Sequence, residues 1–113
     1  EVDQVNHVAI GVKDIGRAGK PGIAVGRFVR LEEDPGTAEF AITVIDEYQG
    51  RGLGTLLMEL LMGAARTRGI EILRGFLLED NRVMIRLLER AGARIKREAG
   101  NVLQADLAVN PPT

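Results

Sequence analysis

The sequence predicts a single mixed α/β domain of the α+β type, whose sheet is mostly antiparallel and contains one parallel strand–helix–strand crossover. Alternating, β-branched segments flank a leucine-rich stretch with helical spacing. Short connections join the first three strand-like segments, which favours antiparallel pairing. A strand, a helix and another strand then follow in order, and such a crossover makes its two strands parallel. At 113 residues, the chain is expected to form one domain, 1–113.

Three strands are predicted in the first half of the chain. The first of them combines alternation of apolar and polar residues with β-branched residues. Gly26 is expected to form a bulge in the second strand. Pro35-Gly36 is the turn signal in a polar hairpin loop. The predicted strands are 7–15, 23–31 and 37–45, joined by turns at 16–22 and 32–36.

Two helices are predicted after the third strand. Apolar residues recur at intervals of three and four, which indicates one buried stripe of a helix that ends at Gly69. Asn81 is predicted to cap a shorter helix that ends at Gly92. A strand at 70–78 separates the helices, and a hairpin of 94–96 and 102–109 closes the domain. The first helix is expected to bury Leu53, Leu56, Leu57, Leu60, Leu61 and Ala64, and the second Met84, Leu87 and Leu88.

Composition argues against several classes of function. The chain has 15 basic and 16 acidic side chains and a net charge of -1, whereas a dedicated nucleic-acid binder normally has a clear basic excess. It contains no cysteine and one histidine, so disulfides are excluded and a structural zinc site would lack its usual ligands. No apolar run approaches the length of a membrane span. We therefore expect a cytoplasmic domain without a metal, nucleic-acid or membrane partner.

The segment 49–55, Gln-Gly-Arg-Gly-Leu-Gly-Thr, forms a glycine-rich turn between the third strand and the first helix. It lacks the lysine of a P-loop, and Thr55 and Leu57 stand where the dinucleotide fingerprint needs its third glycine. The turn offers backbone N–H groups at a helix start, and Arg51 adds positive charge. A diphosphate fits these features best. The alternative is a tight turn that only docks the helix on the sheet.

The turn resembles the signature loop of the GNAT superfamily of acyl-CoA-dependent N-acetyltransferases. That loop reads Q/R-x-x-G-x-G/A after a central strand, and Gln49, Gly52 and Gly54 occupy those places. The segment 79–93, EDNRVMIRLLERAGA, is similar to the family's second cofactor motif, which contains an asparagine, a short helix and a glycine. Within the superfamily, the chain most resembles the GNAT domains of bacterial protein lysine acetyltransferases. The resemblance implies a GNAT-like fold and acetyl-CoA as the cofactor.

The resemblance also implies a set of site residues. In the subgroup, the glutamate of an A-E-F-A strand is taken as the general base, and Glu39 matches it. Burial on an apolar strand face would raise the pKa of this carboxyl; an exposed glutamate or a structural salt bridge is the alternative. A main-chain N–H within 43–45 would polarise the thioester carbonyl. Leu88 stands where many relatives have a tyrosine that protonates the thiolate. The expected cofactor-binding residues are Thr43, Val44, Ile45, Gln49, Gly50, Arg51, Gly52, Leu53, Gly54, Thr55, Asn81 and Met84.

The sequence thus predicts an N-acetyltransferase that moves an acetyl group from acetyl-CoA to a primary amine, with a protein lysine as the favoured acceptor. A small-amine acetyltransferase and a non-catalytic CoA-binding module are the alternatives. GNAT domains usually begin with a strand and two helices that are not found here. We therefore expect an N-terminally truncated domain whose first segment lies outside this chain, cover supplied by another subunit, or a reduced form of the domain. Open apolar sheet surface would then favour a homodimer or another partner. His7, and the helix face with Arg86, Glu89 and Arg90, are predicted to have structural or solvated roles.

Overall fold

The computed structural model of the protein describes residues 6–13 and 22–109. The elements follow the predicted order, with one unpredicted addition, a short 3-10 helix before the glycine turn. Most of the predicted turn at 16–22 lies outside the described residues. The elements are β1 (His7–Val12), β2 (Ala24–Arg30), β3 (Thr37–Val44), η1 (Asp46–Tyr48), α1 (Leu53–Thr67), β4 (Ile72–Leu78), α2 (Arg82–Arg90), β5 (Arg94–Ala99) and β6 (Val102–Ala108).

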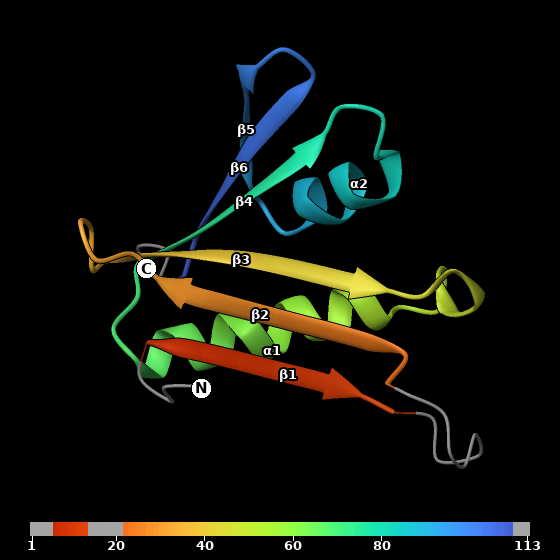
Figure 1. Ribbon diagram of the computed structural model, residues 1–113, viewed down its shortest axis with the longest axis horizontal. Coiled ribbons are helices and arrows are strands. Elements are labelled where there is room, and N and C mark those ends of the chain that lie inside the picture. The colour runs from red at the N-terminus through yellow and green to blue at the C-terminus, as the bar shows by residue number, and fades with distance from the viewer. Residues whose placement is uncertain (1–5, 14–21, 110–113) are drawn as a thin grey trace.

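The strands form one six-stranded sheet in the order β1-β2-β3-β4-β6-β5. Strands β3 and β4 are parallel and all other neighbours are antiparallel, as the crossover predicted. The parallel pairing is short, because its register runs only from Thr37 and Ile72 to Glu39 and Arg74. Beyond this last pair, the two strands diverge towards their carboxyl ends (Figure 1). Backbone pairing between β3 and β4 is therefore interrupted at the centre of the sheet, towards the carboxyl ends of these strands.

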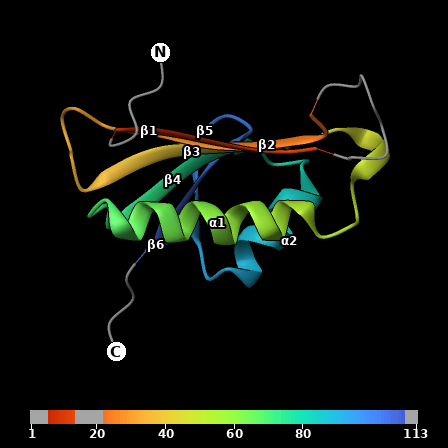
Figure 2. The same cartoon turned by 90° about the horizontal axis from the view of Figure 1, so that it is seen from below.

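Both helices pack on the same face of the sheet (Figure 2). The core lies between them and the strands, where Phe28 of β2, Leu73 of β4 and Leu107 of β6 are almost fully buried. Leu61 of α1 and Leu88 of α2 belong to the same hydrophobic cluster. No described helix covers the other face, and none in the described part of the chain is long and apolar enough to cross a membrane.

Helix α1 is rotated relative to the predicted apolar stripe. It buries Leu57, Met58, Leu61 and Ala65. Leu56 and Leu60, which were also expected to be buried, are 44% and 43% exposed. Spacing alone could not distinguish the two sides of this helix, because leucines and methionines lie on both of them. The prediction that these two leucines face the core was therefore wrong.

Gly26 does not form the predicted bulge. It pairs regularly with Ile10 of β1 and with Ile42 of β3. A Cβ atom at Gly26 would lie 3.1 Å from the Leu61 Cδ1 atom and 3.5 Å from the Leu57 Cβ atom. The glycine therefore lets α1 approach the centre of β2 closely.

Candidate cofactor site

A cleft of about 530 Å³ lies between the end of β3, the glycine turn with the start of α1, and one side of α2. Its volume is within the range of small-molecule binding sites in proteins. The divergence of β3 from β4 exposes this part of the sheet, and α2 follows directly from the end of β4. The cleft is lined by Ile42, Thr43, Val44, Tyr48, Gln49, Gly50, Gly52, Leu53, Gly54, Thr55, Asn81, Val83, Met84, Leu87 and Arg90.

Ten of the twelve residues predicted to bind a cofactor line this cleft, and two do not. The Ile45 N–H donates to the carbonyl oxygen of Ile23 at 3.0 Å, so the sheet already uses it. The Arg51 guanidinium lies over the Tyr48 ring, 4.8 Å from its centroid. The structure therefore brings together the two sequence motifs, which are separated by about one helix and one strand.

Five further residues line the cleft without having been predicted to do so: Ile42, Tyr48, Val83, Leu87 and Arg90. Val83, Leu87 and Arg90 are spaced as i, i+4 and i+7, the period of one helix face. This spacing could have indicated a common surface on α2. Arg90 was instead predicted to lie on an ordinary solvated face. It is exposed, but it also borders the cleft.

The glycine turn adopts a backbone conformation that favours glycine. Gly50 and Gly52 have φ angles of 80° and 82°, in the left-handed region. Gly52 is the N-cap of α1 and has no side chain to cap this helix, and the first turn of α1 has no acidic residue. The first N–H groups of an α-helix lack partners within the helix and carry partial positive charge. The backbone of the turn is therefore suited to an anion.

Gly54 has a different role from the other two glycines of the turn. A Cβ atom at this position would lie 2.7 Å from the Leu87 Cδ1 atom of α2. The absence of a side chain here lets α2 pack against the first turn of α1. This contact brings both helices to the same cleft.

Two amide side chains stabilise the backbone around the cleft. The Gln49 Nε2 atom donates to the Val44 carbonyl oxygen at 3.2 Å and to the Asp46 Oδ1 atom at 3.3 Å, which ties the turn to the end of β3. The Asn81 Oδ1 atom accepts a hydrogen bond from the Met84 N–H at 3.2 Å. This confirms the predicted N-cap of α2. The cap uses the amide oxygen of Asn81, so its nitrogen is the atom suited to contact a ligand.

The backbone of β3 presents alternate residues to its two neighbours. The Ile45 N–H points to the β2 side, whereas the Gly36 carbonyl oxygen accepts from the Ile72 N–H at 3.0 Å on the β4 side. Backbone groups of successive strand residues point to opposite sides. The N–H groups of Ile42 and Val44 therefore point towards the side from which β4 has diverged.

Glu39 lies outside the cleft lining, on the sheet face opposite the helices. It is exposed, so the predicted burial is not found. Its register neighbours are Val29 of β2 and Arg74 of β4. The carboxylate therefore lies beside a cation rather than alone on an apolar face, because the parallel register aligns Glu39 with Arg74.

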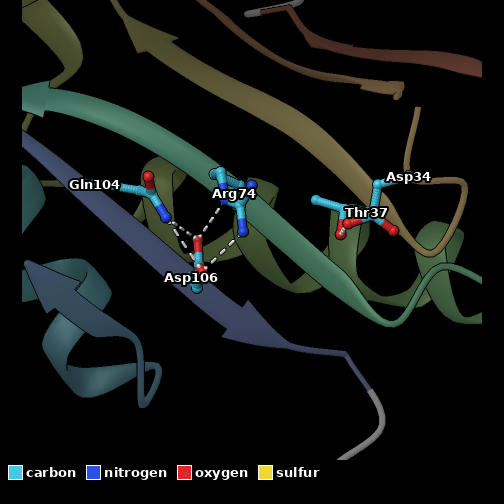
Figure 3. Close-up of polar contacts among 5 residues, drawn as sticks. All are labelled: Asp34, Thr37, Arg74, Gln104 and Asp106. Carbon is cyan, nitrogen blue, oxygen red and sulfur yellow. Dashed lines mark hydrogen bonds and ion pairs between the residues drawn. The ribbon is translucent and has the colours of Figure 1, made fainter. Parts of the chain in front are cut away.

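Arg74 belongs to a polar network on the same face (Figure 3). Its Nε and Nη2 atoms donate to the two carboxylate oxygens of Asp106 at 2.9 and 3.2 Å. The Gln104 Nε2 atom donates to the same carboxylate at 3.2 and 3.3 Å. The hydrogen bond with Asp106 is the main cause that raises the pKa of Arg74; burial opposes it, and the charges of Asp106, Asp34 and Glu39 add to it.

His7 is half-buried on the edge strand β1, and its Nε2 atom is buried without a hydrogen-bond partner. Among the described residues, no group of three His, Cys, Asp or Glu side chains is placed to hold a metal ion.

Comparison with known proteins agrees with this geometry. The Acetyltransferase (GNAT) family matches residues 8–93. Acetyltransferase Pat of Mycolicibacterium smegmatis is 39% identical over 111 residues, which make up 98% of this chain and 33% of that protein. A solved cAMP-binding acyltransferase from Mycobacterium smegmatis is 36% identical with a TM-score of 0.81, over 98% of this chain and 34% of that one. The GNAT domain of S. lividans PAT is 29% identical with a TM-score of 0.84, over 96% of this chain and 64% of that one.

The chain spans about a third of the length of the first two relatives. The family match nevertheless covers most of the chain and includes both the glycine turn and the α2 motif. The mixed sheet with one parallel pair is also the fold of the solved relatives. This chain therefore belongs to the GNAT acetyltransferase family.

Proposed function

We propose that this domain transfers an acetyl group from acetyl-CoA to the side-chain amine of a protein lysine. The observation that carries the proposal is the cleft at the divergence of β3 and β4, which joins an uncapped helix start to an open strand edge. Membership of the GNAT family and the similarity to Acetyltransferase Pat support it. Because a cysteine-free chain suits a reducing compartment, we place the reaction in the cytoplasm.

The two ends of the cleft match the two ends of acetyl-CoA. The diphosphate accepts hydrogen bonds from the backbone at the start of α1, around Leu53 and Gly54. The pantetheine arm lies along the open edge of β3 and pairs with its backbone, as an added strand does. Asn81 and Met84 at the start of α2 contact this arm from the other side. The thioester then lies close to the divergence of the strands.

The reaction needs a base and a donor for the developing oxyanion. A lysine ammonium has a pKa of about 10.4, so it must lose a proton before it attacks the thioester carbon. Glu39 takes that proton through a water molecule. The N–H group of Ile42 or Val44 stabilises the oxyanion, because both point to the open edge. Collapse of the tetrahedral intermediate breaks the C–S bond and forms the amide. The attacking nitrogen gives up its second proton to water, and the CoA thiolate takes up a proton from water to leave as the thiol.

The acceptor approaches from the sheet face without helices. Glu39 lies on that face, whereas α1 and α2 close the other one (Figure 2). Val29 and Phe76 on the same face are 43% and 46% exposed, which is apolar surface that a protein partner would cover. This arrangement favours a macromolecular acceptor over a small amine, and it also suits a second copy of the chain.

The cofactor step is tested by thermal unfolding with acetyl-CoA. At a hundredfold excess over its Kd, a ligand that binds only the folded state stabilises it by about 2.7 kcal/mol. The absence of any shift with acetyl-CoA would reject the cofactor site. A shift without release of free CoA thiol, in the presence of lysine-containing proteins and small amines, would indicate a binding module instead.

The base is tested with Glu39→Gln. We expect a slower release of free thiol by about 10²- to 10⁴-fold, which is the usual contribution of general base catalysis, and little change in the Kd of acetyl-CoA. Glu59→Gln is the matched control, because Glu59 is exposed on α1 and lies outside the cleft. An unchanged rate in Glu39→Gln would reject this residue as the base.

A further inference from the structure

Among the described residues that line the cleft, Arg90 has the only charged side chain. It lies in the last turn of α2, one turn beyond Leu87, which contacts the first turn of α1 at Gly54. Arg90 therefore borders the same end of the cleft as the uncapped helix start. This end is opposite the one at which Asn81 begins α2.

The other arginines near this end are directed elsewhere. Arg51 of the glycine turn lies over the Tyr48 ring and does not line the cleft. Arg86, one turn before Arg90 on α2, is exposed and also does not line it. The positive side-chain charge at the phosphate end of the cleft thus comes from Arg90.

Acetyl-CoA carries two separate phosphate groups at its nucleotide end. The diphosphate is already matched by the backbone N–H groups of the turn, as proposed above. The 3′-phosphate of the ribose is a monoester with a charge of about -1.5 to -2 at pH 7, and guanidinium groups bind such groups through two parallel hydrogen bonds. A helix terminus supplies only about half of a positive charge. A guanidinium at this end of the cleft would supply the 3′-phosphate with a full positive charge, which the helix start does not.

We propose that Arg90 binds the 3′-phosphate of acetyl-CoA and makes the site selective for CoA over 3′-dephospho-CoA. This inference rests on the proposed function. It assigns to Arg90 a role in ligand selection rather than in chemistry.

The test compares acetyl-CoA with acetyl-3′-dephospho-CoA by isothermal titration calorimetry. We expect Arg90→Ala to weaken acetyl-CoA binding by about tenfold, the size of one charge-assisted contact, and to leave the Kd of the dephospho ligand unchanged. Arg90→Lys, which keeps the charge, should recover part of the loss. Arg86→Ala, on the same helix, should bind both ligands like the parent protein.

Equal weakening of both ligands in Arg90→Ala would overturn the proposal, because Arg90 would then contact the diphosphate or support α2 only. Unchanged binding of both ligands would overturn it as well. If the parent protein binds neither ligand, the proposed cofactor site itself is rejected. Failure of the Arg90 proposal can therefore be distinguished from failure of the proposed function. Thermal unfolding without ligand shows whether each variant is folded.

Discussion

The phenyl ring of Phe40 lies against the backbone of Gly75, directly after the last pair of the parallel strands. A Cβ atom at Gly75 would lie 2.6 Å from the Phe40 Cζ atom. The preceding residues, Glu39 and Arg74, form the last pair in the register of β3 and β4. The ring therefore packs between the strands where they begin to diverge, on the core side.

Gly75→Ala should destabilise the protein by about 1–3 kcal/mol, because the added methyl group overpacks the site of the Phe40 ring. Chemical denaturation measures this loss. Gly63→Ala is the matched control, because a Cβ atom at Gly63 in α1 meets no atom within 4 Å. Alanine there should stabilise the protein by about 0.4–1 kcal/mol. Equal effects of the two substitutions would show that Phe40 does not limit the space at Gly75.

Gly52→Ala should reduce both stability and acetyl-CoA binding. The φ angle of 82° costs an L-residue about 1–2 kcal/mol, and relaxation of the turn would move the N–H groups of α1. Gly100→Ala has the same type of strain, since Gly100 has a φ angle of 55° in the β5–β6 turn, away from the cleft. Both substitutions should therefore lower the thermal unfolding temperature, whereas only Gly52→Ala should weaken acetyl-CoA binding and raise its Kd. A weaker Kd in Gly100→Ala would point to a global effect.

Asn81→Ala should cost about 0.5–2 kcal/mol, because it removes the side-chain cap of α2. Asn81→Asp keeps a capping oxygen but lacks the amide N–H₂ group. The aspartate variant should retain the unfolding free energy of the parent protein and lose affinity for acetyl-CoA. Retention of parental affinity by Asn81→Asp would mean that Asn81 acts only as a cap.

The Arg74–Asp106 pair should stabilise the face that carries Glu39. Replacing Arg74 with methionine is expected to cost about 1 kcal/mol, because the side chain is 28% exposed and water screens part of the interaction. The folded state raises the pKa of Arg74. The stability from this shift is therefore fully present below the ordinary pKa of arginine, and is lost only as the pH rises above it.

Chemical denaturation of the parent protein and of Arg74→Met between about pH 7 and pH 10 checks this pH dependence of stability. The difference in unfolding free energy should stay constant over the range, since arginine remains charged throughout it. A difference that falls steadily with pH would assign the effect to another titrating group.

The order of strands and helices was predictable from the sequence because local signals determine it. Alternation marks β3, and Gly69 and Gly92 end the helices with φ angles of 74° and 88°. The Asn81 cap was predictable for the same reason. The glycine turn allowed an anion site to be predicted at the start of α1, because a helix start without a side-chain cap has the same chemistry in any fold.

Only the tertiary structure decided which faces these elements present. The side of α1 that is buried depends on the close approach that Gly26 permits, and the neighbour of Glu39 depends on the register between β3 and β4. The position of Arg90 at the cleft depends on the contact between Gly54 and Leu87. These relationships join residues that are distant in sequence, so packing determines them and the local pattern of residues does not.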